Sequence, residues 1–139
     1  MGAAIRVLQV LGGLEAGGAE AFVMNIYRAV NKEMVQFDFV KHIERKGVFE
    51  DEITKMGGKI YRCPQYNGKN HFAYCKWWDS FFKEHPEYHV IHGHVRSTAS
   101  IYLKIAKKNG LATIAHSHST SNGSGISAIV KDMLQLPIR

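Results

Sequence analysis

Residues 5–20 read IRVLQVLGGLEAGGAE, and this stretch decides how the rest of the chain is interpreted. Its first seven residues are mostly apolar and β-branched, which predicts a strand buried on both faces. Four glycines then fall within residues 12–18, where no regular element can form. Apolar residues next recur at helical spacing, at Ala19, Phe22, Val23, Ile26, Tyr27 and Val30. The stretch therefore predicts a strand, a glycine-rich turn and a helix in succession.

The rest of the chain repeats this alternation. Further strands are expected at residues 35–39, 60–61, 88–92 and 111–115, and further helices at residues 48–56, 72–83, 98–106 and 126–136. In the second strand, apolar residues alternate with Gln36 and Asp38, so we expect this strand to be less buried than the first. Strands that alternate with helices predict an α/β fold. We expect a single domain over residues 1–139, with a doubly wound, mainly parallel sheet and helices on both faces.

The composition restricts the kinds of partner that the domain can have. The 139 residues suffice for one domain with a hydrophobic core, and 45% of them are apolar. The net charge of +6 favours anionic partners. Because this charge is dispersed and no nucleic-acid-binding motif is present, we expect no nucleic acid partner. Apolar runs are too short to span a membrane, and a secretory signal is not expected. Two cysteines, Cys63 and Cys75, without a paired motif indicate a cytoplasmic protein that has no disulfide framework.

The glycine-rich turn is a candidate phosphate site. In doubly wound folds, ligands bind beyond the carboxyl ends of the strands, and glycines there let a phosphate approach backbone N–H groups at a helix start. The spacing does not give the dinucleotide fingerprint, and Lys41-His42 stand where that fingerprint wants an acidic residue. The P-loop pattern fails as well, because Gly18 and Ala19 occupy its Lys and Ser/Thr positions. The turn therefore suits a phosphate without matching either common motif.

Two histidine pairs follow later strands. His92 and His94 end the fourth predicted strand, and His116 and His118 end the fifth. Because the carboxyl ends of parallel strands share one sheet edge, both pairs are expected beside the glycine turn. A neutral imidazole can donate or accept a hydrogen bond, which suits a sugar hydroxyl or an oxygen linked to phosphate.

A metal centre is the alternative reading of the same histidines. Pairs spaced i, i+2 on a strand end are ligands in zinc-dependent hydrolases, so a metal-dependent hydrolase remains an open function. A catalytic metal would need a third ligand from another strand end. The acidic candidates lack a persuasive spacing, and we therefore expect no metal; they are Glu15, Glu20 and Glu44.

Three segments together resemble one enzyme family. The run Gly17-Gly18-Ala19-Glu20 resembles the motif that opens the first helix of retaining, two-domain glycosyltransferases of the GT-B fold. Val90–Arg96 and Thr113–Ser119 resemble the strand-end histidine segments of the same large family, which builds bacterial exopolysaccharide, capsule and lipopolysaccharide. Each motif is short, but their order and placement agree over residues 5 to about 130.

The resemblance implies a fold and a function. It implies a Rossmann-like, acceptor-side N-terminal domain of a longer hexosyltransferase, truncated here and inactive without a C-terminal donor-binding domain. The substrate would be a UDP- or GDP-sugar, with no other cofactor. The acceptor would be a polysaccharide, a lipid-linked glycan or another glycan. The implied roles are a catalytic, sugar-positioning residue at His116, a donor-phosphate or cleft loop at Gly17 and Gly18, and an acceptor site at His94, Arg96 and His118. A non-catalytic nucleotide-binding module remains a further alternative.

An aromatic helix is the remaining feature of note. Residues 72–82 hold six aromatic side chains within three turns. We expect this helix to pack on the sheet and to leave some aromatic surface exposed. A peripheral contact with the inner membrane face through Trp77 and Trp78 is the alternative, which the positive net charge would assist.

Overall fold

A five-stranded parallel sheet forms the centre of the domain. The computed structural model describes residues 4–13 and 17–116, and its strand order there is β3-β2-β1-β4-β5, with every neighbouring pair parallel. The strands are β1 (Ile5–Leu11), β2 (Val35–Lys41), β3 (Ile60–Arg62), β4 (Tyr88–Gly93) and β5 (Ala112–Ala115). The helices between them are α1 (Gly18–Ala29), α2 (Glu50–Lys55), α3 (His71–Glu84) and α4 (Arg96–Lys108). The predicted α/β class is confirmed, while the helix expected at 126–136 lies outside the described residues.

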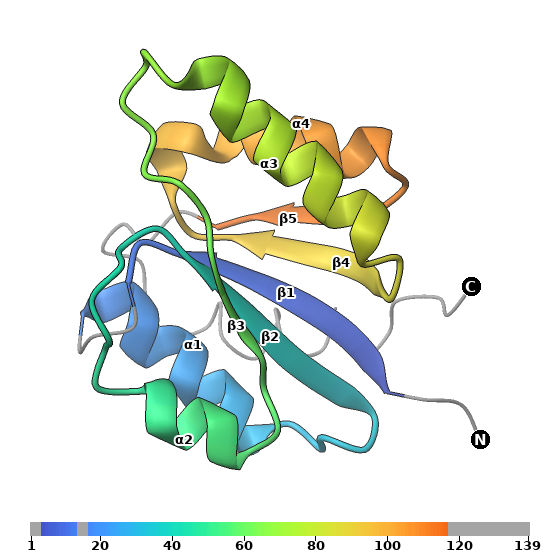
Figure 1. The fold of residues 1–139 in the computed structure, drawn as a ribbon. Coiled ribbons are helices and arrows are strands. Elements are labelled where there is room, and N and C mark those ends of the chain that lie inside the picture. The colour runs from blue at the N-terminus through green and yellow to red at the C-terminus, as the bar shows by residue number, and fades with distance from the viewer. Residues whose placement is uncertain (1–3, 14–16, 117–139) are drawn as a thin grey trace.

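The helices form two layers, one on each face of the sheet. Figure 1 shows α1 and α2 on one side of the strands and α3 and α4 on the other. Side chains of β1 alternate between the two cores, with Val7 packing among the residues of α1 and Leu8 among those of α3 and α4. A doubly wound sheet has a core on each face, so its central strand must bury apolar side chains on both faces, as β1 does.

The second strand corrects one expectation. All seven residues of β2 are buried, whereas the first two residues of β1 are only half-buried. The reason is position, because β2 lies inside the sheet between β1 and β3. Its buried Asp38 carboxylate accepts hydrogen bonds from Arg6 (2.8 Å), the Lys59 amide (2.8 Å) and the Tyr88 hydroxyl. These partners offset the cost of burying the charge, so alternating polarity did not mark an exposed face.

The aromatic helix α3 belongs mainly to the core. Trp78 is fully buried and stacks on Tyr102 of α4, with ring centroids 5.2 Å apart. Trp77 is half-buried, and Phe72 is 86% exposed at the start of the helix. The packed-helix expectation is therefore confirmed, and a membrane contact through Trp78 is wrong because the core holds that side chain. None of the described helices is long and apolar enough to cross a bilayer.

Candidate functional site

The order of the strands places the candidate site. The chain moves from β1 to β2 and β3 on one side, whereas β4 and β5 lie on the other side of β1. The carboxyl ends of β1 and β4 therefore border the point at which the strand order reverses, where open α/β sheets bind their ligands. His94 directly follows β4 and His116 directly follows β5. The glycine turn follows β1, so the predicted features share this edge.

Backbone hydrogen bonds fix both histidines to the sheet. The His94 amide donates to the Val10 carbonyl at 3.0 Å, and the His116 amide donates to the Gly93 carbonyl at 3.0 Å. Each bond continues the parallel ladder one residue beyond the end of its strand. These bonds hold the backbones of His94 and His116 in register with the neighbouring strands.

Three histidine rings form a compact cluster. The ring centroids of His92 and His94 are 4.1 Å apart, and His116 lies 5.5 Å from His92 and 5.8 Å from His94. His92 is fully buried, His94 is nearly so, and His116 is half-buried. The structure therefore brings the predicted residues His94 and His116 together, with His92 beneath them.

Gln9 orients His94, and the sequence analysis missed it. This side chain is fully buried in β1, and its Oε1 lies 2.8 Å from His94 Nε2. Because an amide oxygen only accepts hydrogen bonds, His94 Nε2 carries the proton and donates it. A glutamine in the middle of an otherwise apolar buried strand was the available signal, since a buried polar side chain needs a partner.

Phe22 of α1 forms an apolar wall beside the cluster. Its ring centroid lies 4.7 Å from that of His116 and 6.4 Å from that of His94. Helical periodicity had placed Phe22 in the core, yet it is only half-buried. Loss of hydration lowers the pKa of His116 below its usual 6.5, so this imidazole is neutral near pH 7. A neutral ring next to an apolar wall can hydrogen-bond an uncharged hydroxyl.

The glycine turn borders the same edge. Gly17 is the N-cap of α1 and Gly18 its first residue, and both are exposed. The Gly12 carbonyl accepts hydrogen bonds from the amides of His42 (2.8 Å) and Ile43 (2.9 Å), which ties the turn to the loop after β2. The Glu20 carboxylate folds back against Gly17 and places negative charge at the positive end of the helix dipole.

Similarity to known proteins agrees with this geometry. No protein-family model matches the chain. It is 33% identical over 132 residues to the Bacillus subtilis (strain 168) protein named "Putative glycosyltransferase EpsF". The aligned residues make up 94% of this chain and 34% of EpsF. The fold matches a crystal structure of MurG from Acinetobacter baumannii, a protein of the GT-B fold, with a TM-score of 0.61 at 14% identity over 92% of this chain and 39% of MurG. The chain has the Rossmann-like fold of a GT-B domain, and its sequence is similar to that of a glycosyltransferase. It spans about a third of the length of EpsF.

Three of the predicted residues of the GT-B domain lie partly or wholly outside the described part of the chain. Arg96 begins α4, but only its backbone is described. His118 and Glu15 lie outside the described residues. Within residues 4–13 and 17–116, no three His, Cys, Asp or Glu side chains are placed to hold a metal ion. Of the other acidic candidates, Glu44 pairs with Arg62 at 3.7 Å on the surface.

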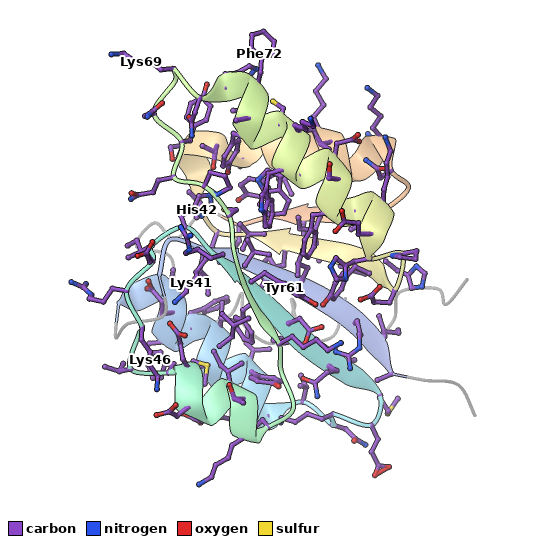
Figure 2. The ribbon with its side chains drawn as sticks, viewed as in Figure 1. Lys41, His42, Lys46, Tyr61, Lys69 and Phe72 are labelled. Atoms are coloured by element: carbon purple, nitrogen blue, oxygen red, sulfur yellow. The ribbon has the colours of Figure 1, made fainter. Side chains whose placement is uncertain are left out.

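His42 links four elements of the GT-B domain at the same edge. Its Nδ1 lies 3.0 Å from the Leu11 carbonyl, so Nδ1 is protonated, and its Nε2 lies 2.8 Å from the Tyr74 hydroxyl. That hydroxyl is also 2.9 Å from Thr98 Oγ1 at the start of α4. The neighbouring Lys41 points to the opposite face of the sheet and pairs with Glu50 at 2.6 Å (Figure 2). The side chains of Lys41 and His42 therefore hold neighbouring loops in place. A dinucleotide-binding site would instead have an acidic side chain at this end of β2.

Acidification is expected to destabilise the GT-B domain through His42. Burial lowers the pKa of His42 below 6.5, although the bond to the Leu11 carbonyl opposes this shift. The unfolded chain therefore binds a proton that the folded chain resists, and the free energy of unfolding falls as the pH drops below 6.5. The limiting slope is about 1.4 kcal/mol per pH unit for each such histidine. Urea unfolding at a series of pH values should show a shallower slope in His42→Gln, while the exposed-site variant His89→Gln keeps the wild-type slope. An unchanged slope in His42→Gln would contradict this assignment.

Proposed function

We propose that this domain is the acceptor-side half of an enzyme that transfers a sugar from a UDP- or GDP-sugar to a glycan or lipid-linked acceptor, with retention of configuration. The observation that carries the proposal is the meeting of His94, His116 and the glycine turn at the edge where the strand order reverses. The similarity to EpsF supports sugar transfer as the class of reaction. The donor sugar itself is the substrate, and no other cofactor is invoked.

His116 is proposed to position the transferred sugar. Its ring is neutral near pH 7, half-buried, and flanked by Phe22. One imidazole nitrogen can then donate to a sugar hydroxyl while the other accepts, which fixes the ring of the sugar relative to the acceptor. Protonation would remove the accepting nitrogen, so this role requires a pH above the lowered pKa of His116.

Gly17 and Gly18 are proposed to contact the donor diphosphate or to line the cleft beside it. Their amides stand at the start of α1, where free N–H groups and the helix dipole favour an anion. Departure of the nucleoside diphosphate builds up negative charge, and stabilising that charge is the main electrostatic task of the reaction. Because the Glu20 carboxylate lies against Gly17, a diphosphate at this position requires the Glu20 side chain to turn away.

His94 is proposed to contact the acceptor. Gln9 holds its Nε2 proton, so the ring has a defined tautomer and orientation. Arg96 and His118 are proposed to complete the acceptor side, Arg96 by pairing with an anionic group. Most of the donor would be bound by a further domain of the intact enzyme, so this domain alone should have no transferase activity.

Phe72 is the residue through which we propose contact with a membrane that carries a lipid-linked acceptor. It is 86% exposed at the start of α3, and Lys69 precedes it in the same exposed turn (Figure 2). An exposed aromatic side chain beside a cation suits the interface of an anionic membrane at the cytoplasmic face.

The intact enzyme provides the test of the proposed function. Incubation with a panel of UDP- and GDP-sugars should release nucleoside diphosphate in an acceptor-dependent manner, and NMR of the product should show the anomeric configuration of the donor. An inverted anomer would refute retention, and no turnover with any donor and acceptor would refute the transferase. Stoichiometric zinc in the purified protein would instead support the metal-dependent hydrolase.

A further inference from the structure

A hollow of about 510 Å³ lies on the other side of the sheet from the histidine cluster. One stripe of α3, at residues 73, 76, 77, 80, 81 and 84, forms its long wall together with the C-cap residue His85, and Tyr61 of β3 faces this stripe. Tyr61 is labelled in Figure 2, where it projects from β3 on the α3 side of the sheet. The aromatic residues of the hollow pack with the core shared by α3 and α4, whereas the histidines adjoin α1. The hollow is therefore separate from the candidate active site.

The aromatic side chains of the hollow are held in place by one another. The Trp77 and Phe81 rings stack with centroids 5.0 Å apart and planes 11° apart. Tyr61 meets Phe81 edge-on at 4.8 Å and lies 5.1 Å from His85. Trp77 also meets the buried Trp78 edge-on at 5.0 Å. Because these contacts fix the rings, a ligand would find a largely preformed surface.

The polar side chains around this surface are uncommitted. Among the residues that the structure describes, Lys76, Ser80 and Glu84 form no side-chain hydrogen bond or ion pair with one another or with a neighbour. They follow each other at intervals of four residues along one line of α3. Lys76 and Glu84 are thus about 12 Å apart along the helix axis, with the Ser80 hydroxyl between them. Lys76 places a hydrogen-bond donor at one end of the hollow and Glu84 an acceptor at the other. The opposite charges of these two side chains cancel.

We infer that the hollow binds a neutral oligosaccharide. A pyranose ring has one face of C–H groups, which packs on an aromatic ring, and hydroxyls around its edge that both donate and accept hydrogen bonds. Trp77 and Tyr61 supply the aromatic surfaces, and the line from Lys76 to Glu84 supplies partners over roughly the length of a disaccharide. A phosphorylated ligand would meet the Glu84 carboxylate, and a purely apolar ligand would make no use of the three polar side chains.

The site would hold a glycan on this domain at a distance from the reacting groups. Tethering one part of a growing chain raises the effective concentration of its other end without a new contact at the catalytic edge. The inference rests on the chemistry of the hollow, so binding here is expected whether or not His116 takes part in sugar transfer.

Saturation-transfer NMR on the full-length protein tests the inference. The probes are maltotriose, cellotriose and chitotriose, three neutral trisaccharides that differ in linkage and N-acetylation. At least one should receive saturation from the wild type, and this signal should be lost in Ser80→Arg, whose side chain fills the hollow. Trp77→Leu should also lose most of the signal, because it keeps apolar volume but removes the aromatic face. No signal from any probe, or an undiminished signal in Ser80→Arg, would overturn the inference.

Two controls separate this site from the active site. Ser100→Arg places the same side chain on an exposed position of α4 away from the hollow and should bind as the wild type does. His116→Ala should keep the trisaccharide signal, whereas Ser80→Arg should keep nucleoside diphosphate release from the donor. A signal that disappears in His116→Ala but persists in Ser80→Arg would place the trisaccharide at the catalytic edge and refute the hollow.

Discussion

Replacing His116 by alanine in the intact enzyme is expected to lower kcat/KM for sugar transfer by about 100-fold or more, the usual scale for a lost positioning contact at a reacting centre. The loss follows from the geometry, because the His116 amide is bonded to the Gly93 carbonyl at 3.0 Å and the ring contacts both Phe22 and the other histidines. Alanine keeps the backbone bond and removes both imidazole nitrogens. The measurement is initial rates over a range of donor concentrations, so that effects on kcat and KM are separated.

The pH profile and a matched variant distinguish positioning from general damage. In the wild type, kcat/KM should fall as the pH drops through the lowered pKa of His116, because protonation removes the accepting nitrogen. His116→Gln retains one donor and one acceptor, so it should recover part of the activity and lose this limb of the profile. His89→Ala, on an exposed strand position, should leave the rate unchanged. Activity of His116→Ala within twofold of the wild type would remove this residue from the proposed mechanism.

The layered fold could be predicted from residues 5–20 and the alternation that follows. The period of 3.6 residues in the helices and the apolar runs in the strands are local properties of the sequence. Both can be recognised in one segment without knowing which elements pack against it. The burial of β2 could not be predicted in this way. Asp38 makes the strand read as half-exposed, but Arg6, Lys59 and Tyr88, distant in sequence, surround its carboxylate. Only the strand order shows that this aspartate lies inside.

The candidate site was only partly predictable for the same reason. His94 and His116 could be placed at one edge because parallel strands put their carboxyl ends together. Gln9 and Phe22 could not be assigned to the site, since a strand pattern and a helix stripe both assign such positions to the core. His42 was read only as a residue that breaks a dinucleotide fingerprint. Its bonds to the Leu11 carbonyl and the Tyr74 hydroxyl depend on contacts made over more than thirty positions in sequence.

Replacing Gly93 by alanine is expected to destabilise the domain by about 2–3 kcal/mol, at the upper part of the range for overpacking a core. A Cβ atom at this position would lie 2.5 Å from the Tyr102 hydroxyl oxygen and 2.7 Å from Cε1 of the same ring. Tyr102 cannot easily move aside. It is fully buried, its hydroxyl donates to the Val95 carbonyl at 2.9 Å, and its ring stacks on Trp78. Equilibrium unfolding in urea measures the loss.

Two comparisons make this result specific to the contact with Tyr102. Gly12→Ala should cost little, because a Cβ at Gly12 meets nothing within 4 Å. In a Tyr102→Leu background, the further change Gly93→Ala should cost much less than in the wild type, which a double-mutant cycle would report as a coupling energy between contacting residues. Equal costs of Gly93→Ala in the two backgrounds would contradict the steric explanation.

Because the Gly93 carbonyl holds the His116 amide, a backbone shift at Gly93 would also displace His92, His94 and His116. The glycine between the two histidines is therefore required by the packing of α4 on the sheet, and the geometry of the histidine cluster depends on that packing.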